Sequence, residues 1–389
     1  MKILVVSQYY YPEPFRITDI CETLVSRGHS VTVLTGQPNY PEGKIYEGYK
    51  NYYMSENING VSVYRTKIHP RKKGNLHLLL NYISFPLYAN RTLKRIDNDF
   101  DVVFINQLSP IISALPGLKY AKRHKVKSYL YCLDLWPESL KSGGIKSNSL
   151  IYKVFGIVSK HIYKKCNKVL VTSKSFIDKF KEFNIEVEYL PQYAEDVFVK
   201  IPEHVKEYNK FYCTFAGNIG EMQSVETILY AAKELIEQKD IIINIYGNGS
   251  RFDYIKSLKQ TLELDNVVLH GRKDISEMPT VYAKSDALII TMKNDSLLSM
   301  TLPGKVQTYL AAGKPIIGSI GGEARLVINE SGAGYVCDPE DAIGLSELIK
   351  KAKDNPHITN FGYLGRKFYD ENYNKRAFFT KLEKLLNEE

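Results

Sequence analysis

The sequence predicts an α/β protein built from two Rossmann-like domains that face each other across a cleft. Its 389 residues exceed what one ordinary core holds and suit two domains of conventional size. Hydrophobic residues make up 44% and charged residues 24% of the chain, as in ordinary globular proteins. Short apolar runs alternate with helical patterns in both halves, which is typical of parallel sheets with helices on both faces.

Five apolar runs predict the strands of the first domain, which we place at residues 1–195. These runs are residues 3–7, 30–36, 101–106, 128–134 and 168–173. Between the first two, an apolar stripe at helical spacing ends at Gly28, as a helix with a C-terminal glycine does. The first run is too short for the core of a signal peptide and is interpreted as a first strand. The scattered cysteines favour the cytosol.

Six further runs predict the second domain, which we place at residues 200–369 after a polar, proline-bearing linker. These runs are residues 211–218, 241–249, 266–271, 286–292, 315–320 and 333–338. A C-terminal helix, residues 370–389, could pack back on the first domain. Ligands in open α/β sheets lie beyond the carboxyl ends of the strands, so the loops that follow these strands should line the cleft.

The net charge of +9 indicates an anionic partner: nucleic acid, an anionic membrane face or a phosphorylated substrate. The basic clusters all fall in the first half, at residues 69–74, 90–95, 119–127 and 160–168. The five cysteines are scattered and never stand in C-x-x-C spacing, which argues against a disulfide framework or a zinc site.

One helical segment, residues 75–96, is apolar nearly all round its middle and has basic clusters at both ends. It can be a core helix of the first domain or a segment at a membrane interface. Its apolar run is shorter than the ~20 residues that span a membrane, while Lys and Arg beside Tyr82, Phe85 and Tyr88 suit the headgroup layer. Nucleic-acid binding needs aromatic positions on a basic, groove-sized face. Long apolar stretches accompany the basic residues instead, which favours an anionic membrane surface over nucleic acid.

Residues 301–324 predict a loop, a helix, a strand and a glycine turn, an order that cradles ligands in α/β proteins. Pro303 suits the first turn of a helix starting near Gly304, whose free N–H groups and dipole favour an anion. Lys305 in this turn opposes the helix dipole, so we expect it to serve a ligand. A solvated lysine without a special role is the alternative.

The next turn contains Gly321 and Gly322, where backbone could approach a ligand closely, and Glu323 starts the following helix. Glycine turns follow two earlier strands, one of them at Gly247. Neither has the full G-x-G-x-x-G pattern or the acidic residue of a nicotinamide site, so dinucleotide binding is poorly supported. Arg272, just beyond another strand, could pair with phosphate or form a structural ion pair.

Together these stretches resemble the retaining GT-B glycosyltransferases, and within them the bacterial branch for surface polysaccharides that includes L-fucosamine transferases. The matching stretches follow one another over most of the chain, at residues 10–49, 134–140, 215–232, 270–289 and 302–324. The resemblance implies two Rossmann-like domains and transfer from a nucleotide-sugar. The wider family has two glutamates eight residues apart, and Met300 and Thr308 stand at those positions.

The cationic clamp of the family also differs. An Arg and a Lys that hold the pyrophosphate match Asn218 and Gln223 in this sequence. We expect Lys305 and Arg272 to replace them, so that the cradle holds the pyrophosphate of a nucleotide-sugar. The negative charge on the leaving diphosphate would be stabilised by a helix N-terminus and a lysine. No convincing D-x-D metal-binding loop is present, because we interpret residues 97–99 as a solvated turn. We expect neither a metal ion nor a cofactor.

The acceptor side is less well defined by the sequence. The family often has a histidine where this chain has Leu133, and the following loop offers Asp134, Trp136 and Glu138. We assign Arg16, Trp136 and Glu138 to acceptor contact and Asp134 to a catalytic role. Alternatively, a phosphate oxygen of the leaving group takes the acceptor proton, as the resemblance to retaining enzymes would allow.

The expected function is metal-independent transfer of an N-acetylated sugar from a UDP-sugar to a polyprenyl-diphosphate-linked saccharide. This would occur at the cytoplasmic face of the cell membrane, in capsule or O-antigen synthesis. Apolar side chains in residues 296–304 would favour a deoxy sugar such as UDP-N-acetylfucosamine. A catalytically silent nucleotide-sugar-binding or scaffold subunit is the alternative. A nonhydrolysing epimerase would need cleft acids and bases that the sequence does not show.

Overall fold

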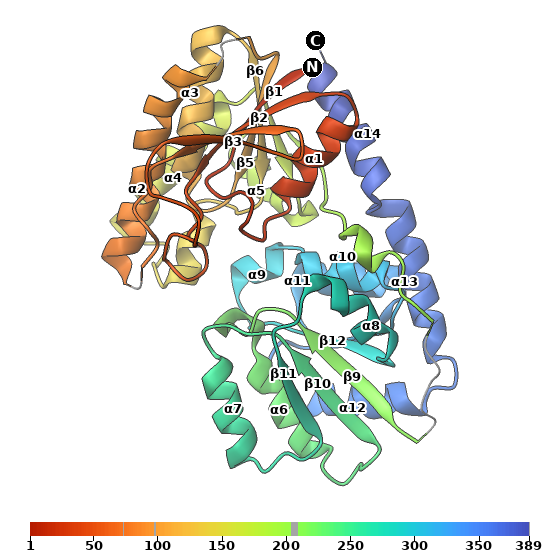
Figure 1. Cartoon of the computed structure of the whole chain (residues 1–389). Helices are drawn as coiled ribbons and strands as arrows, with labels where there is room; N and C mark the ends of the chain where they lie inside the picture. Colours follow the sequence, from red (N-terminus) through yellow and green to blue (C-terminus); the bar gives the residue numbers. More distant parts are fainter. Residues whose placement is uncertain (73, 97–98, 204–208, 389) are drawn as a thin grey trace. The chain divides into compact units, whose positions relative to one another are not determined.

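The computed structural model describes residues 1–72, 74–96, 99–203 and 209–388. The chain divides into two compact units, and each contains one sheet flanked by helices (Figure 1). The first unit is Met1–Leu190 with Leu382–Glu389, and the second is Pro191–Lys381. The predicted α/β fold class is confirmed.

The first unit contains an eight-stranded sheet with the order β3-β4-β2-β1-β5-β6-β7-β8. Its strands are β1 Lys2–Val6, β2 Ser30–Gly36, β3 Met54–Ile58, β4 Val61–Thr66, β5 Val102–Gln107, β6 Lys127–Cys132, β7 Lys168–Val171 and β8 Val187–Tyr189. The central strands are apolar on both faces because helices cover both sides; in β1, for example, Val5 is fully buried and pairs with Val33 and Phe104. The five predicted strands of this half are confirmed.

The β3–β4 pair was not predicted, and it is antiparallel, so the first sheet is not wholly parallel. The two strands meet at Asn59 and Gly60, whose φ angles are 49° and 85°. An Asn-Gly pair with positive φ at both residues is the usual signal for a two-residue hairpin turn. Polar residues in β3 hid the strand from a search for continuous apolar runs.

The helices of the first unit surround this sheet. They are α1 Ile17–Ser26, α2 Asn75–Thr92, η1 Leu93–Arg95, η2 Ile111–Ala114, α3 Leu115–His124, η3 Glu138–Gly143, α4 Leu150–Lys165 and α5 Lys174–Glu182. The last turns of α14 (Lys375–Asn387) also belong to this unit. There Glu383 accepts two hydrogen bonds of 2.7 Å from the Arg27 guanidinium, and its Oε1 lies 3.1 Å from Nε2 of His29.

The second unit contains a six-stranded, wholly parallel sheet with the order β11-β10-β9-β12-β13-β14. The strands are β9 Phe211–Ala216, β10 Ile241–Tyr246, β11 Val267–Gly271, β12 Ala287–Thr291, β13 Ile316–Ser319 and β14 Gly334–Cys337. All six were predicted. The remaining elements are η4 Asp196–Phe198, η5 Glu221–Gln223, α6 Val225–Glu234, α7 Phe252–Thr261, η6 Ile275–Glu277, α8 Met278–Ala283, α9 Ser296–Met300, α10 Gly304–Ala311, α11 Gly322–Ser331, α12 Ala342–Asp354 and α13 Ile358–Asn372.

Two apolar clusters make up the core of this unit. One joins the sheet to α6 and α12 through residues such as Ile228 and Leu345, and the other joins it to α10 and α13 through Leu310 and Tyr369. These packed helices hold the loops at the carboxyl ends of the strands in place, and those loops carry the chemistry described below. None of the described helices is long and apolar enough to cross a membrane.

Candidate functional site

Glycine turns at the carboxyl ends of β9, β10 and β11 pack directly against one another. The amide of Gly217 donates to the carbonyl of Tyr246 at 2.9 Å, and the amide of Gly247 donates to the carbonyl of Gly271 at 2.8 Å. Gly217 and Gly247 have φ angles of 146° and 144°. A Cβ atom on Gly247 would lie 1.8 Å from the Gly217 carbonyl oxygen, so only glycine permits this approach.

The helix α10 is anchored beside these turns by Tyr309. Its buried hydroxyl accepts a hydrogen bond from the amide of Ala216 at 3.2 Å and lies 3.3 Å from the Ile289 carbonyl oxygen. Lys305 precedes Tyr309 by four residues, so the two side chains lie on the same face of the helix. Because Ala216 ends β9, this anchor places Lys305 next to the turn that begins at Gly217.

The Lys305 ammonium lies between an aromatic ring and a glycine turn. Its Nζ atom lies 3.7 Å from the centroid of the Phe215 ring, and a Cβ on Gly217 would lie only 2.9 Å from it. Within the part of the chain that the structure describes, no carboxylate forms an ion pair with it. Burial lowers the pKa of Lys305 to about 7. A cation held without a counterion marks a candidate for ligand binding.

Asn218 and Gln223, which stand where the family has its cationic clamp, lie together in the turn after β9. The Asn218 amide nitrogen donates to Oε1 of Gln223 at 3.1 Å, and the same oxygen accepts from the Gly220 amide at 3.2 Å. The Thr291 hydroxyl donates to the Gln223 carbonyl at 2.6 Å, which ties the turn to the end of β12. Both residues therefore stand near Gly217, although neither carries charge.

Two cations near this turn were missed in the sequence. Lys293 follows β12, and its Nζ atom lies 3.0 Å from Oε1 of Glu221. Arg251 precedes α7, and its amide donates to the Ile219 carbonyl at 3.0 Å. Lys293, and more weakly Arg251, lower the pKa of Glu221. The sequence analysis considered only Lys305 and Arg272, because Lys293 and Arg251 are distant from the Gly217 turn in sequence and approach it only in the fold.

The remaining predicted donor residues are more dispersed. Arg272 is exposed on the loop after β11, a strand that β10 separates from β9, and it forms no ion pair with any described residue. Gly322 has a φ angle of 60°, and a Cβ there would lie 1.9 Å from the Ser299 carbonyl oxygen. The close backbone approach at Gly322 is thus to α9. Gly321 packs against Pro339, and Glu323 is 3% exposed in the first turn of α11.

In the first unit, the loop after β6 carries the predicted acceptor residues. The Asp134 carboxylate accepts a 2.7 Å hydrogen bond from the amide of Ser109, and burial raises the pKa of Asp134. Trp136 is 3% exposed, and its indole N–H donates to the Ser109 hydroxyl at 3.0 Å. Ser109 thus ties both residues to the loop after β5. Asp134 remains partly exposed, so it is the more accessible of the two.

The other two residues assigned to acceptor contact are Glu138, which begins η3 just after that loop, and Arg16, near the start of the chain. Glu138 is 1% exposed, accepts a hydrogen bond from the Tyr152 hydroxyl at 3.2 Å and lies 3.3 Å from the Lys179 ammonium. Arg16 directly precedes α1, and its charge opposes the rise that burial causes in the pKa of Tyr131. Glu138 and Trp136 have internal partners, and their assignment to acceptor contact stays a prediction.

Comparison with known proteins then assigns both units. Residues 16–191 match the glycosyltransferase family 4 and residues 197–368 match the glycosyl transferases group 1, so the two matches cover most of the chain. Sucrose-phosphate synthase from Thermosynechococcus elongatus superposes with a TM-score of 0.77 at 15% identity, over 99% of this chain and 98% of that one. The chain is a GT-B glycosyltransferase.

Other solved structures share the fold of this glycosyltransferase. HepE from Anabaena, in complex with UDP and glucose, has a TM-score of 0.71 at 13% identity over 100% of both chains. TarM from S. aureus, in complex with Fondaparinux, alpha-GlcNAc-glycerol and UDP, has a TM-score of 0.67 at 12% identity over 100% of both chains. These likenesses concern the fold.

Three curated relatives are bacterial proteins, and two of them are named as glycosyltransferases. The probable glycosyltransferase WbjE of Pseudomonas aeruginosa is 25% identical over 71% of this chain and 70% of its own length. The putative colanic acid biosynthesis glycosyl transferase WcaI of Escherichia coli is 25% identical over 80% of this chain and 82% of its own. N-acetyl-alpha-D-glucosaminyl L-malate synthase of Bacillus anthracis is 21% identical over 95% of this chain and 91% of its own.

The two positions where the wider family has glutamates lie close to this site in sequence but carry no charge. Thr308 is 8% exposed, and its hydroxyl donates to the Gly304 carbonyl at 3.1 Å inside α10. Met300 ends α9 and is partly exposed. Leu297 and Leu302, from the same apolar segment, are 8% and 4% exposed and pack in the core of the unit. The glycosyltransferase therefore has a less polar surface here than the family pattern implies.

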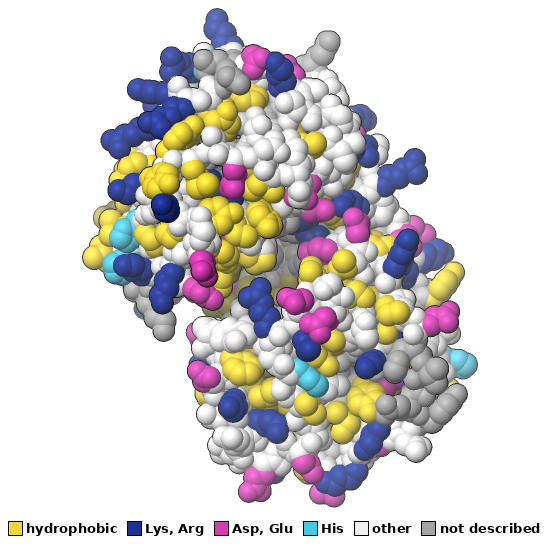
Figure 2. All heavy atoms as spheres, in the orientation of Figure 1, with side chains coloured by type: hydrophobic (Ala, Val, Ile, Leu, Met, Phe, Trp, Pro, Cys, Tyr) yellow, Lys and Arg dark blue, Asp and Glu magenta, His cyan; other side chains and the backbone are white. Residues whose placement is uncertain are grey.

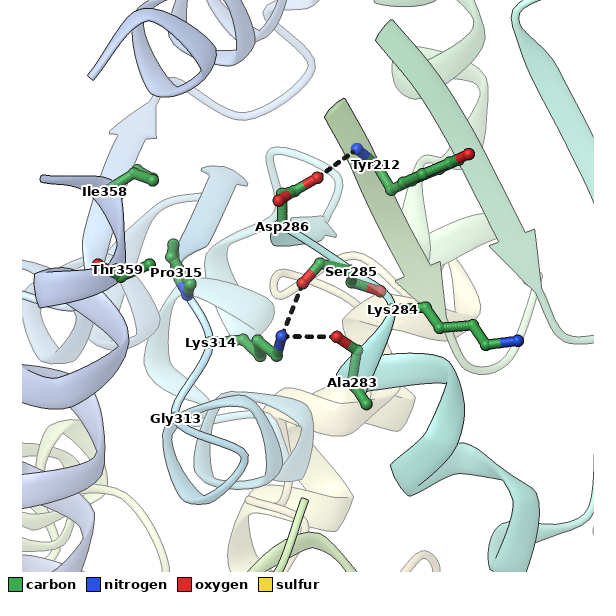
Figure 3. A pocket seen from close by; sticks show the side chains of 10 residues that line it. All are labelled: Tyr212, Ala283, Lys284, Ser285, Asp286, Gly313, Lys314, Pro315, Ile358 and Thr359. Atoms are coloured by element: carbon green, nitrogen blue, oxygen red, sulfur yellow. Dashed lines mark hydrogen bonds between the residues drawn. The ribbon is translucent and has the colours of Figure 1, made fainter. Parts of the chain in front are cut away.

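A separate hollow of about 240 Å³ lies at the other end of the second sheet (Figure 3). Most of its residues lie before or at the start of β9, β12 and β13, and Ile358 and Thr359 begin α13, whereas the glycine turns follow the strands. The Lys314 ammonium points between the carbonyls of Ala283 and Ser285 and donates to both at 2.9 Å. Asp286 accepts the amide of Tyr212 at 2.8 Å. Lys314, which precedes β13, therefore has a structural role, because its ammonium binds carbonyl groups at the carboxyl end of α8.

Proposed function

We propose that this glycosyltransferase moves an N-acetylated sugar from a UDP-sugar to a polyprenyl-diphosphate-linked saccharide, with retention and without a metal ion. It acts in bacterial surface polysaccharide synthesis at the cytoplasmic face of the membrane. The second unit binds the donor and the first unit binds the acceptor. The observation that carries this proposal is the Lys305 ammonium beside Gly217, with no carboxylate partner among the described residues.

The diphosphate of the donor supplies the missing counterion. Glycine at position 217 allows the ammonium to lie against the backbone of the turn, because a Cβ there would come within 2.9 Å of Nζ. Negative charge develops on the diphosphate as the bond between the sugar and the phosphate breaks. Lys305 therefore stabilises the transition state more than the bound substrate. Lys293 and Arg251 stand near the same turn and extend the positive field, although Glu221 offsets part of it.

The proton of the acceptor hydroxyl goes to an oxygen of the leaving diphosphate in this proposal. The bond between the anomeric carbon and the donor phosphate oxygen breaks, and the bond to the acceptor oxygen forms on the same face of the sugar. Asp134 is the alternative base, because burial raises its pKa above the ordinary value and so makes the carboxylate a stronger base. Its Oδ2 atom already accepts a hydrogen bond from Ser109.

The substrates are supported by relatives and structural neighbours. HepE is complexed with UDP, and the TarM complex contains UDP and an N-acetylglucosaminyl compound. The Bacillus relative is named for an N-acetylglucosaminyl product, and WcaI is named for colanic acid biosynthesis. These names support a UDP-linked, N-acetylated donor and a polysaccharide product. The deoxy character of the sugar now depends on Met300 and Leu298, because Leu297 and Leu302 are committed to the core.

The surface of the first unit supports action at a membrane. On α2, Phe85 and Ala89 are buried in the core, whereas the outer face exposes apolar residues. The exposed residues are Leu76, Leu79, Leu80, Ile83 and Leu87. Helix α4 exposes Leu150, Ile151, Val154 and Ile157 in the same way, and both helices contact η2. Helix α2 therefore contributes its inner face to the core and exposes an apolar outer face, which suits the interface of a bilayer.

A ligand screen tests the donor assignment. The melting temperature is measured with UDP, GDP, ADP and TDP sugars, because a ligand that binds the folded state stabilises it by mass action. UDP-N-acetylaminosugars should raise it most, and isotope-labelled donor should then be consumed in the presence of acceptor and excess EDTA. Selective stabilisation by a GDP-sugar would refute the donor class. Binding with neither hydrolysis nor transfer would favour the silent-subunit alternative.

A further inference from the structure

The first unit contains a hollow that the proposed transfer reaction does not use. It has a volume of about 740 Å³ and lies beside α2, between the end of β4 and helix α3. Four cations line it: Lys67, Arg91, Lys94 and Lys119. They come from four different elements or loops, so the fold gathers them at one place on the surface.

These cations have no carboxylate partners within residues 1–72, 74–96, 99–203 and 209–388. No Asp or Glu is among the described residues that line the hollow. Tyr88 holds two of the cations together, because Lys67 Nζ lies 5.7 Å and Arg91 Cζ 5.6 Å from the centroid of its ring. Like charges gathered without counterions favour the binding of an anion.

One wall of the hollow is apolar and exposed. Leu80, Ile83 and Leu87 line it with exposed fractions of 41%, 40% and 60%. In Figure 2, Lys and Arg side chains stand next to hydrophobic ones along the edge of this unit where α2 and α3 lie in Figure 1. A free phosphate ion would use the cations but leave the apolar wall in water. A ligand with an anionic head and an apolar tail matches both parts.

We propose that this hollow binds the phosphate headgroup of an anionic phospholipid, with the acyl chains against the outer face of α2. The site deepens the proposed membrane association and rests on it, because it gives that surface a defined lipid contact. Lys67 and Lys119 are the residues that distinguish this site from the basic clusters at the ends of α2. The guanidinium of Arg91 and the ammonium groups provide charge-assisted hydrogen bonds to the phosphate oxygens.

The test uses the full-length protein and dihexanoyl-phosphatidylglycerol below its micelle-forming concentration. Titration calorimetry should show saturable binding at one site, and at least tenfold weaker binding of dihexanoyl-phosphatidylcholine and of inorganic phosphate. The double variant Lys67→Ala, Lys119→Ala should bind phosphatidylglycerol about tenfold more weakly or worse. The matched control is Lys44→Ala, Lys122→Ala, which removes two exposed lysines of the same unit from outside the hollow and should bind normally.

The outcomes separate this site from the broader proposal. Equal weakening in both double variants would replace the site with diffuse attraction, and equal binding of the two lipids would remove the charge argument. Circular dichroism and melting temperatures confirm that the variants fold, which is expected because all four lysines are exposed. If monomeric lipid binds but phosphatidylglycerol vesicles do not recruit the wild-type protein, the hollow stands and the membrane role fails.

Discussion

Two basic regions of this glycosyltransferase hold their positive charge in opposite ways. Near the carboxyl end of the second sheet, the Lys305 ammonium is partly buried, lies against an aromatic ring and has a depressed pKa. Along α2 of the first unit, several cations stand in solvent next to exposed leucines. Burial makes the charge of Lys305 costly in free energy unless an anion binds beside it. Each exposed cation contributes little to the binding of an anionic partner by itself, but the contributions add. The first arrangement suits stabilisation of a leaving group, and the second suits binding to an anionic membrane surface.

The largest expected effect is the loss of membrane binding when the exposed cations near α2 are removed. Neutralising Arg71, Lys72, Lys73, Arg91, Lys94 and Arg95 together should abolish sedimentation with anionic vesicles. Each basic side chain near such a surface contributes about 1 kcal/mol, so the set contributes several. High salt should release the wild-type protein in the same assay, because it screens these charges. Lys73 lies outside the described residues. Unchanged sedimentation of the sixfold variant would contradict the membrane surface.

The next effect in size concerns the buried charge. Lys305→Ala should reduce transfer on the order of 10²-fold or more, because a contact to the leaving group in a protected site is lost. Lys256→Ala, an exposed lysine on α7, is the matched control and should turn over normally. Initial rates with UDP-sugar and lipid-linked acceptor measure both variants. Near-normal turnover of Lys305→Ala would show that the ammonium does not serve the diphosphate.

The pH dependence of stability sharpens the same comparison. The pKa of Lys305 falls from its ordinary 10.5 to about 7 in the fold, so the unfolded state binds more protons between these pH values. The cost of the buried charge is therefore full below pH 7 and declines towards pH 10.5. Lys305→Met should raise the melting temperature at pH 6 and raise it less at pH 9. The same variant of an exposed lysine, Lys256→Met, should show no such trend.

The two regions also differ in how far the sequence predicts them. The apolar runs predicted every strand of the second sheet, and the Pro303–Gly304 pattern predicted where α10 begins. The sequence does not show that Lys293 and Arg251 converge on the Gly217 turn, because that contact joins three separate loops. Nor does it show which way a side chain points, so the burial of Trp136 and Glu138 could not be predicted. The β3–β4 hairpin, by contrast, had a readable signal at Asn59.

The choice of donor sugar predicts a smaller effect. Met300 and Leu298 remain partly exposed where the wider family would present a carboxylate, and an apolar side chain cannot accept a hydrogen bond from a sugar hydroxyl. Transfer from the 6-deoxy analogue of UDP-N-acetylglucosamine should therefore be preferred by about 10-fold over UDP-N-acetylglucosamine itself. A competition assay with both donors measures the ratio. Equal turnover would mean that the pocket recognises the sugar through other residues.

The smallest effect concerns the contact that holds the last turns of α14 to the first unit. Arg27, and then His29, lower the pKa of Glu383 to about 2, although burial opposes this. The unfolded state therefore binds more protons than the folded state between about pH 4.5 and pH 2, and the contribution of this carboxylate is lost as the pH falls through that range. Glu383→Gln should lower the free energy of unfolding by about 1 kcal/mol at pH 7, since the hydrogen bonds are charge-assisted but lie at the surface. Urea unfolding at pH 7 and at pH 4 measures this change in the free energy of unfolding, and the difference from the wild type should be smaller at pH 4.

The control is Glu371→Gln, which changes an exposed glutamate on α13 and should unfold like the wild type at both pH values. A Glu383→Gln variant as stable as the control at pH 7 would show that the buried leucines of α14 hold the helix without this ion pair.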